Sequence, residues 1–284
     1  MLYAKLICSW MPCEEILRRW TKQSQGDGRW DDLQMVLDEK KADYFVVINF
    51  PFAGEQIEPR HTIIFPMEPE HNRGNWGAWR NPPPGKFLRV MSHDKHYNNL
   101  QWHLSQTYSE LMEQPVDKSL VFSSVTSDLV EFEGQRKRVQ FLKTLSGSGI
   151  PFDLFGRGNR CQIPNYRGAL PTVKKDAGLF PYQYTFAGEN CREYNYFTEK
   201  LIDAILAECL CFYWGCPNVS DYIDPRAFIP VDLDRPREAI EVIRSAIAGK
   251  EWENRVEIIR AEKKKILTQL QFFPRLHRLL HSIG

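Results

Sequence analysis

The 284-residue sequence lacks any apolar run long enough to cross a membrane, and no basic segment followed by an apolar one opens it. It also lacks an excess of charge of either sign, because 37 Lys and Arg residues balance 36 Asp and Glu residues. No global field therefore favours nucleic acid or an anionic membrane. We expect a protein without a transmembrane segment and without a nucleic-acid partner.

Paired cysteines at metal-binding or redox spacing are missing too. The seven cysteines are an odd number and include no CxxC pair, while Cys8, Cys209 and Cys211 lie in apolar, strand-like surroundings. Buried, reduced thiols are the usual state of such residues. Together with the missing leader and anchor, this cysteine usage predicts a soluble cytoplasmic protein.

The segment His93-Asp94-Lys95-His96, with His103 further on, invites a metal-binding interpretation. Its spacing fits no strong ligand pattern, and neither cysteines nor closely clustered carboxylates complete one. A surface loop followed by an amphipathic stretch explains it better, so no metal site is predicted.

Short apolar runs alternate with helical stretches along the chain, which is typical of an α/β fold with open, largely parallel sheets. The length suffices for two domains with separate cores. Strands are expected at 2–10, 43–49, 61–65, 87–91, 119–125, 151–158, 184–188 and 209–214, and helices at 12–20, 134–145, 237–248 and 252–273, the last ended by Pro274.

A hinge is expected at 114–118. It divides the chain into an N-terminal domain, 1–115, a second domain, 116–260, and a C-terminal helix, 261–284, that packs back toward the first domain. The second domain contains the most informative stretch, 184–215.

In that stretch an apolar run ends at Gly188, a polar loop follows, and Thr198 is a good N-cap for a helix whose apolar residues begin at Leu201. A second strand closes the βαβ unit. Ligands bind such units where the carboxyl ends of the strands meet the helix N-termini. A phosphate there would meet free backbone N–H groups, the positive helix end and the Lys200 ammonium. Lys174 and Lys175, which precede the unit, are expected to be solvated.

The segment FAGENCREYNYFTEKL closely resembles the donor-binding motif of the α1,3-fucosyltransferases, F-x-x-E-N-S, a spacer and D-Y-x-T-E-K-L. Cys191 stands where that family usually has Ser, and Asn195 where it has Asp. A looser similarity continues to Asp232. The residues that match in type and spacing are Glu189, Asn190, Tyr196, Thr198, Glu199, Lys200 and Leu201.

The resemblance implies a GT-B-like α/β fold, with two Rossmann-type domains facing a central cleft. It implies an inverting glycosyltransferase of the soluble bacterial or viral type that transfers L-fucose from GDP-fucose to a hydroxyl of a glycan acceptor. A nucleotide sugar is then the donor, and no bound metal or other cofactor is required.

The resemblance also assigns roles to residues. Lys200 and Arg138 would stabilise the departing pyrophosphate, with Arg136 the alternative to Arg138. Tyr196 and Glu199 would hold the nucleoside, whereas Glu189 and Asn190 would lie nearest the sugar.

A second resemblance concerns the catalytic base. The family's M-E-S-P segment is similar to the segment Phe65-Pro66-Met67-Glu68-Pro69-Glu70. Glu68 matches the proposed base of that segment, and Glu70 is its rival. A Glu held between apolar residues and prolines would also gain basicity by partial desolvation.

Two other functions stay open. The same machinery could use another nucleotide sugar such as UDP-xylose, because the motif mainly describes how a nucleoside diphosphate is held. Alternatively, the chain is a catalytically silent glycan-binding protein that keeps the fold and its aromatic surfaces.

Overall fold

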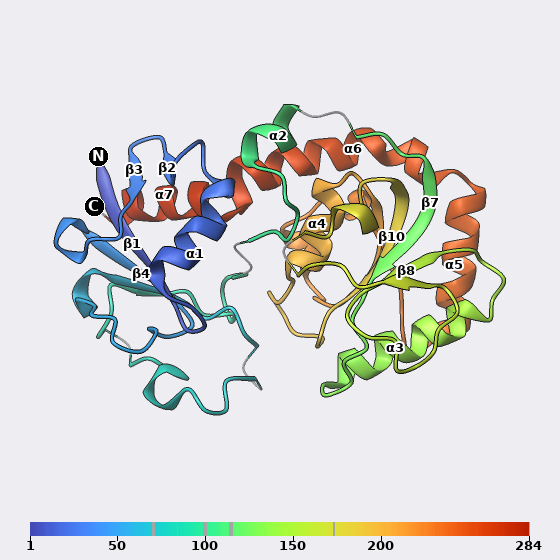
Figure 1. Cartoon of the computed structure of the whole chain (residues 1–284), viewed down its shortest axis with the longest axis horizontal. Helices are drawn as coiled ribbons and strands as arrows, with labels where there is room; N and C mark the ends of the chain where they lie inside the picture. The colour runs from blue at the N-terminus through green and yellow to red at the C-terminus, as the bar shows by residue number, and fades with distance from the viewer. Residues whose placement is uncertain (70–71, 84, 99–100, 114–115, 173, 284) are drawn as a thin grey trace. The chain divides into compact units, whose positions relative to one another are not determined.

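The computed structural model describes residues 1–69, 72–83, 85–98, 101–113, 116–172 and 174–283 (Figure 1). The chain forms two compact units. The first comprises 1–101, 106–110 and 267–284, and the second comprises 102–105 and 111–266. Residues 114 and 115 of the predicted hinge lie outside the described residues.

The first unit is built on a 6-stranded sheet with the order β2-β3-β1-β4-β5-β6. All neighbours are parallel except β2 and β3. The predicted strands along β1, β4, β5 and β6 are confirmed, whereas the short pair β2 and β3 was not predicted. The bounds are β1 Leu2–Cys8, β2 Arg29–Trp30, β3 Leu33–Met35, β4 Tyr44–Ile48, β5 Thr62–Phe65 and β6 Arg89–Val90.

One face of this sheet is covered by residues from both ends of the chain. Helix α1 (Cys13–Trp20) contributes Ile16 and Trp20, and α7 (Phe272–Ile283) contributes Phe272, Phe273, Leu276 and Leu280 to the same buried cluster. The ring centroids of Trp20 and Phe272 lie 4.9 Å apart in an edge-to-face contact. The C-terminal helix is therefore part of the core of the first unit.

The prediction that Pro274 ends the preceding helix is wrong. Helix α6 (Glu251–Lys265) runs into a π-helical segment, Ile266–Leu270, and Pro274 then lies in the first turn of α7. Proline is tolerated in a first turn, because the N–H that it lacks would have no partner within the helix.

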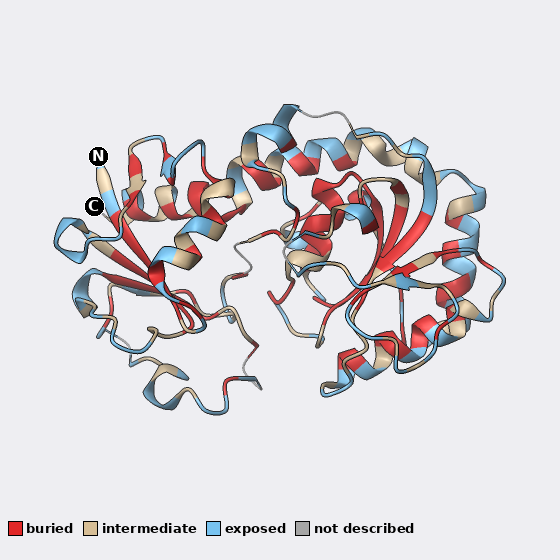
Figure 2. Cartoon of the chain, in the orientation of Figure 1, coloured by how far each residue is buried: buried red, intermediate tan, exposed pale blue. Residues whose placement is uncertain are grey.

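The second unit contains another 6-stranded sheet, with the order β12-β11-β10-β7-β8-β9, and all its neighbouring strands are parallel. Figure 2 shows that its central strands are buried, while the outer surfaces of the flanking helices are exposed. The strands are β7 Leu120–Val125, β8 Asp153–Phe155, β9 Tyr166–Gly168, β10 Tyr182–Gly188, β11 Leu210–Trp214 and β12 Phe228–Pro230.

The helices of the second unit pack against its sheet and against one another. Helix α3 (Glu133–Ser146) contacts β10 and α5 (Pro236–Ala248), α5 also contacts α6, and α4 (Glu199–Leu206) contacts β10, β11 and α6. The short helix α2 is Tyr108–Glu113. The predicted βαβ unit is confirmed as β10, α4 and β11, which places the polar loop 189–198 at the carboxyl end of the sheet.

Among the described residues, no helix combines the length and the apolar character that crossing a membrane would require. The seven cysteines all lie in the described ranges and are free thiols.

Candidate functional site

The site is centred on the loop that joins β10 to α4. The Thr198 side chain accepts a hydrogen bond from the Lys200 N–H at 3.5 Å, so the predicted N-cap is confirmed. The Lys200 ammonium folds back onto the same hydroxyl, with 2.8 Å between Nζ and Oγ1. The cap thus fixes both the start of α4 and the position of the Lys200 head group.

Glu189, the first residue after β10, is fully buried and organises this loop. Its Oε1 accepts the Thr198 N–H at 2.8 Å, and its Oε2 accepts the Thr198 hydroxyl at 2.7 Å and the Lys200 ammonium at 3.1 Å. Hydrogen bonds to a buried carboxylate are strong, and they offset the cost of removing its charge from water. Glu189 therefore holds Thr198 and Lys200 in place.

This arrangement corrects one expectation. A phosphate at the start of α4 was expected to meet free backbone N–H groups, but the N–H of Thr198 donates to Glu189 and that of Lys200 donates to the Thr198 hydroxyl. Two of the backbone N–H groups at this helix end are therefore already engaged within the chain. An added anion would meet fewer backbone N–H groups than expected, so cationic side chains would contribute more of its binding.

Two glycines allow this close packing. A Cβ atom on Gly215, after β11, would lie 2.4 Å from Cγ of Glu189. A Cβ atom on Gly134, at the start of α3, would lie 2.5 Å from the Asn190 carbonyl oxygen, which accepts the Gly134 N–H at 3.1 Å. Any side chain at either position would displace the 189–190 segment.

Helix α3 brings Arg138 to this segment. The guanidinium donates to the Asn190 side chain at 2.9 Å, to the Gly188 carbonyl at 3.2 Å and to the Ser127 hydroxyl at 3.2 Å. Burial lowers the pKa of Arg138, and Glu189 opposes that shift. By contrast, Arg136 is exposed and donates to the carbonyls of its own loop, Val130 and Glu131. Arg138 is thus the arginine that lies beside the motif.

The prediction that Lys175 is solvated is wrong, although Lys174 is exposed. The Lys175 side chain is 13% exposed, and its ammonium lies 3.0 Å from Asp203 and 3.2 Å from Glu199. The backbone N–H of His103 donates to Asp203 at 2.8 Å, and its ring lies 3.8 Å from Glu199. Lys175 therefore joins two carboxylates of α4.

The two carboxylates respond differently to burial. Burial favours the neutral acid at both, and it raises the pKa of Asp203 from 3.8 to about 6. At Glu199 burial is outweighed by Lys175, Lys200 and His103, which hold its pKa well below the usual value. Because Lys175 pairs with both acids, Glu199 stays ionised and can accept hydrogen bonds from a ligand's hydroxyl groups.

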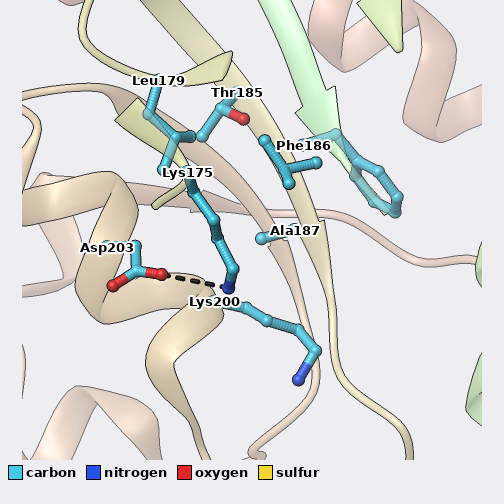
Figure 3. A pocket seen from close by; sticks show the side chains of 8 residues that line it. Lys175, Leu179, Thr185, Phe186, Ala187, Lys200 and Asp203 are labelled. Carbon is cyan, nitrogen blue, oxygen red and sulfur yellow. Dashed lines mark ion pairs between the residues drawn. The ribbon is translucent and has the colours of Figure 1, made fainter. Parts of the chain in front are cut away.

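A pocket opens beside this network (Figure 3). The Lys175 side chain reaches along its wall to Asp203, while the Lys200 ammonium points away from that pair. The lining combines two cations and one carboxylate with apolar residues of the sheet. These residues are Val125, Lys175, Leu179, Thr185, Phe186, Ala187, Lys200 and Asp203.

The departures from the family motif have structural counterparts. Asn195 has a φ angle of 58°, a left-handed conformation that Asn and Asp adopt more readily than most residues. Its side chain accepts hydrogen bonds from Asn218 and Tyr222. Burial raises the pKa of the Cys191 thiol, which is therefore neutral.

Tyr196, which matches the motif, is only 3% exposed, so its ring packs inside the unit.

Glu68 belongs to the first unit and lies on the segment that follows β5. Its carboxylate accepts the Asn72 amide at 2.7 Å, and its backbone carbonyl accepts the Arg73 guanidinium at 2.8 Å. The preceding Met67 N–H donates to Asn49 at 2.8 Å. The Glu68 side chain is half-buried. Its segment is held by the contact of Met67 with Asn49 before it and by the contact of its own carbonyl with Arg73. The rival base, Glu70, lies outside the described residues.

The predicted residues of the second unit gather in two connected groups. Glu189, Thr198, Glu199 and Lys200 form one, and Arg138 with Asn190 forms the other.

Sequence reasoning missed Lys175, Asp203 and His103. The signal for Asp203 was its position among apolar residues of the helix Leu201–Leu206, since an acid on a buried helix face needs a partner. No local pattern marks Lys175.

The two units, each built on a largely parallel sheet with flanking helices, have the GT-B fold of solved glycosyltransferases. Residues 118–247 match the family model Glycosyltransferase family 10 (fucosyltransferase) C-term. The matched region contains the whole β10–α4–β11 unit and Arg138. The resemblance to the α1,3-fucosyltransferase family is therefore confirmed.

Individual relatives show the same resemblance. The chain is 37% identical over 71 residues to alpha-(1,3)-fucosyltransferase FucT of Helicobacter pylori, an alignment that spans 25% of this chain and 15% of that relative. A solved alpha1,3-fucosyltransferase has a TM-score of 0.53 at 15% identity, covering 90% of this chain and 80% of that one. An alpha-glucosyltransferase (AGT) in complex with UDP has a TM-score of 0.59 at 8% identity, covering 100% and 99%. At such identities the solved structures establish the fold alone.

Proposed function

We propose that this protein is an inverting glycosyltransferase that transfers L-fucose from GDP-fucose to a hydroxyl group of a glycan acceptor. The supporting observation is the hydrogen-bonded set of Glu189, Thr198 and Lys200, with Arg138 on Asn190, at the carboxyl end of β10. This set lies inside the region that matches the fucosyltransferase family model. It concentrates cationic donors where a βαβ unit receives its ligand.

In the proposed reaction, a base removes the proton of an acceptor hydroxyl, and the oxygen attacks the anomeric carbon of the sugar. The new glycosidic bond forms on the face opposite the bond that breaks, so the configuration inverts and GDP departs. Negative charge grows on the pyrophosphate in the transition state, and preorganised cations stabilise such charge. Lys200 and Arg138 supply these cations, and no metal ion is required for this role.

We assign Glu199 to the nucleoside, where its ionised carboxylate accepts from ribose hydroxyls, and Asn190 to the transferred sugar. Because the Tyr196 ring is buried, we propose that Tyr196 shapes the loop that holds the nucleoside. Glu189 takes a different role from the one that the motif suggested. Since both its oxygens are engaged with Thr198 and Lys200, we propose that it positions Lys200 instead of contacting the sugar.

A donor panel tests the proposal. Melting temperatures of the intact chain are measured with GDP-fucose, UDP-xylose, UDP-glucose and a dTDP-sugar, and transfer and hydrolysis of each are assayed. A ligand that binds the folded state raises the melting temperature by mass action. We expect a shift and turnover with GDP-fucose. A UDP-selective result would overturn the choice of donor, and binding without turnover of any donor would indicate a silent glycan-binding protein.

We propose Glu68 as the base. Glu68→Gln removes the proton acceptor but keeps the amide oxygen available to Asn72, so transfer should fall by at least about a hundredfold while GDP binding, measured by calorimetry, is retained. Glu70→Gln is the matched control and should stay active. If Glu70→Gln is the inactive variant and Glu68→Gln turns over normally, the base is Glu70.

A further inference from the structure

Three side chains of the first unit converge at a place unrelated to the donor residues. Asp32 lies in the connection between β2 and β3, and His277 and His281 lie on α7. Nε2 of His277 is 2.7 Å from Oδ1 of Asp32, and Nε2 of His281 is 3.0 Å from the same oxygen. One nitrogen from each histidine and one carboxylate oxygen all lie within 4.8 Å of one another.

The spacing of these atoms suits a small divalent cation. Zinc binds His nitrogen and carboxylate oxygen at about 2.0–2.1 Å, so neighbouring ligand atoms of a tetrahedral site lie about 3.3 Å apart. The two Nε2–Oδ1 separations, 2.7 and 3.0 Å, are shorter than that value by about 0.6 and 0.3 Å. An ion could therefore enter after a small outward movement of Asp32 or His281, whose side chains are 45% and 50% exposed.

The backbone around the cluster is already fixed. The two histidines are four residues apart on one helix, and they therefore lie on the same face, as in helical zinc-binding motifs. Helix α7 is anchored in the core through Phe273, Leu276 and Leu280. On the other side, the Asp32 carbonyl accepts the Leu2 N–H at 2.7 Å, which ties the connection to β1. Rigid supports of this kind reduce the ordering cost of binding an ion.

We propose that Asp32, His277 and His281 form a binding site for zinc or a similar divalent transition metal. The ion takes Nε2 of each histidine and Oδ1 of Asp32, with water as the fourth ligand. Each imidazole then carries its remaining proton on Nδ1. The site joins two segments 245 residues apart in the sequence and links α7 to the connection between β2 and β3. Bound metal therefore stabilises the first unit.

The test uses the full chain freed of metal by a chelator. Zinc binding is followed by calorimetry and by the melting temperature, and Co²⁺ serves as a spectroscopic probe, because its visible absorption reports coordination number. We expect one Zn²⁺ per chain, a rise in melting temperature, and a Co²⁺ spectrum of a four-coordinate N/O site without thiolate bands.

Variants locate the ion. His281→Ala and Asp32→Asn should each weaken zinc binding on the order of tenfold or more, since each removes one of three protein ligands. His61→Ala is the matched control, because His61 is an exposed histidine of the same unit, and it should bind zinc as the unmodified chain does. Zinc binding that survives in His281→Ala and Asp32→Asn, thiolate bands with Co²⁺, or no saturable binding by the unmodified chain would each overturn the proposal.

Discussion

At the scale of single residues, Lys200 and Glu189 depend on one another. The ammonium is one of the groups that neutralise a fully buried carboxylate, and the carboxylate in turn holds the ammonium beside the pocket. Lys200 therefore serves both the proposed chemistry and the fold. Comparing a replacement that removes its positive charge with one that keeps the charge separates the two roles.

Lys200→Ala should lower turnover on the order of a hundredfold or more, because it removes a preorganised cation from the leaving group. It should also lower the melting temperature, because the Glu189 charge loses a partner. Lys200→Arg keeps the positive charge and should recover most of the stability. The measurements are single-turnover rates and thermal unfolding. Near-normal turnover of a folded Lys200→Ala variant would refute its leaving-group role.

Arg138 and Arg136 form a natural pair for comparison. Arg138→Lys retains a charge but loses the guanidinium contacts, from Nη1 to Asn190 and Gly188 and from Nη2 to Ser127, so we expect turnover to fall roughly tenfold to a hundredfold and GDP affinity to weaken. Arg136→Lys changes an exposed side chain and should leave both unchanged. The opposite ranking in calorimetry and turnover would mean that Arg136 contacts the pyrophosphate.

At the scale of elements, α4 carries an acid whose ionisation opposes folding. Asp203 has a pKa of about 6 in the fold against 3.8 for the free side chain, so the native state binds more protons between these values. The stability contributed by this group is therefore full below pH 4 and is lost as the pH rises through 6. Asp203→Asn lacks this dependence.

Urea unfolding of the unmodified chain and Asp203→Asn from pH 4 to 7.5 measures the effect. Relative to Asp203→Asn, the unmodified chain should lose about 2.5 kcal/mol of unfolding free energy over that range. Parallel pH profiles of the two proteins would show that Asp203 stays ionised throughout. Asp176→Asn, a change outside α4, serves as the control for a general effect of charge.

The elements themselves were largely predictable, whereas the contacts within the site were less so. Apolar runs bounded by Gly or Pro identified β1, β4 to β8, β10 and β11, and Thr198 identified the start of α4. The two-residue strand β2 carries no periodicity that a sequence pattern could reveal. The motif letters gave the identity of Glu189 but not the direction of its side chain. That direction depends on tertiary contacts: the Glu189 N–H donates to the Trp214 carbonyl, and Gly215, after β11, leaves room for the side chain.

Lys175 shows why part of the site was missed. Two adjacent lysines in a polar stretch usually face solvent, and nothing in their spacing distinguishes Lys175 from Lys174. The distinction arises from tertiary structure, because the Lys175 N–H donates to the His103 carbonyl at 3.0 Å and its side chain then meets two acids of α4. Such pairings between distant segments leave no local signal.

At the scale of the whole molecule, the first unit depends on residues that follow the second unit in the chain. Phe273 is fully buried, and its ring stacks 6.5 Å from that of Trp30. Phe273→Ala should destabilise the first unit by about 3–5 kcal/mol, since it leaves a cavity in the core. Calorimetry of Phe273→Ala should show that the first unit unfolds at a lower temperature than in the unmodified chain. Leu279→Ala, at a partly buried position, should lower this unfolding temperature less. An unchanged thermogram for Phe273→Ala would mean that α7 contributes little to this core.

The same chain path sets an order of events during synthesis. Domains generally fold as units while the chain emerges, the earlier one first. Here the sheet of β1 to β6 leaves the ribosome early but lacks the aromatic cover of α7 until residues 267–284 have been made. The second unit is complete before then. A chain that ends at residue 266, extended by a linker long enough to carry that residue out of the ribosome, should therefore contain a protease-resistant second unit alongside an N-terminal segment that is still protease-sensitive and available to chaperones.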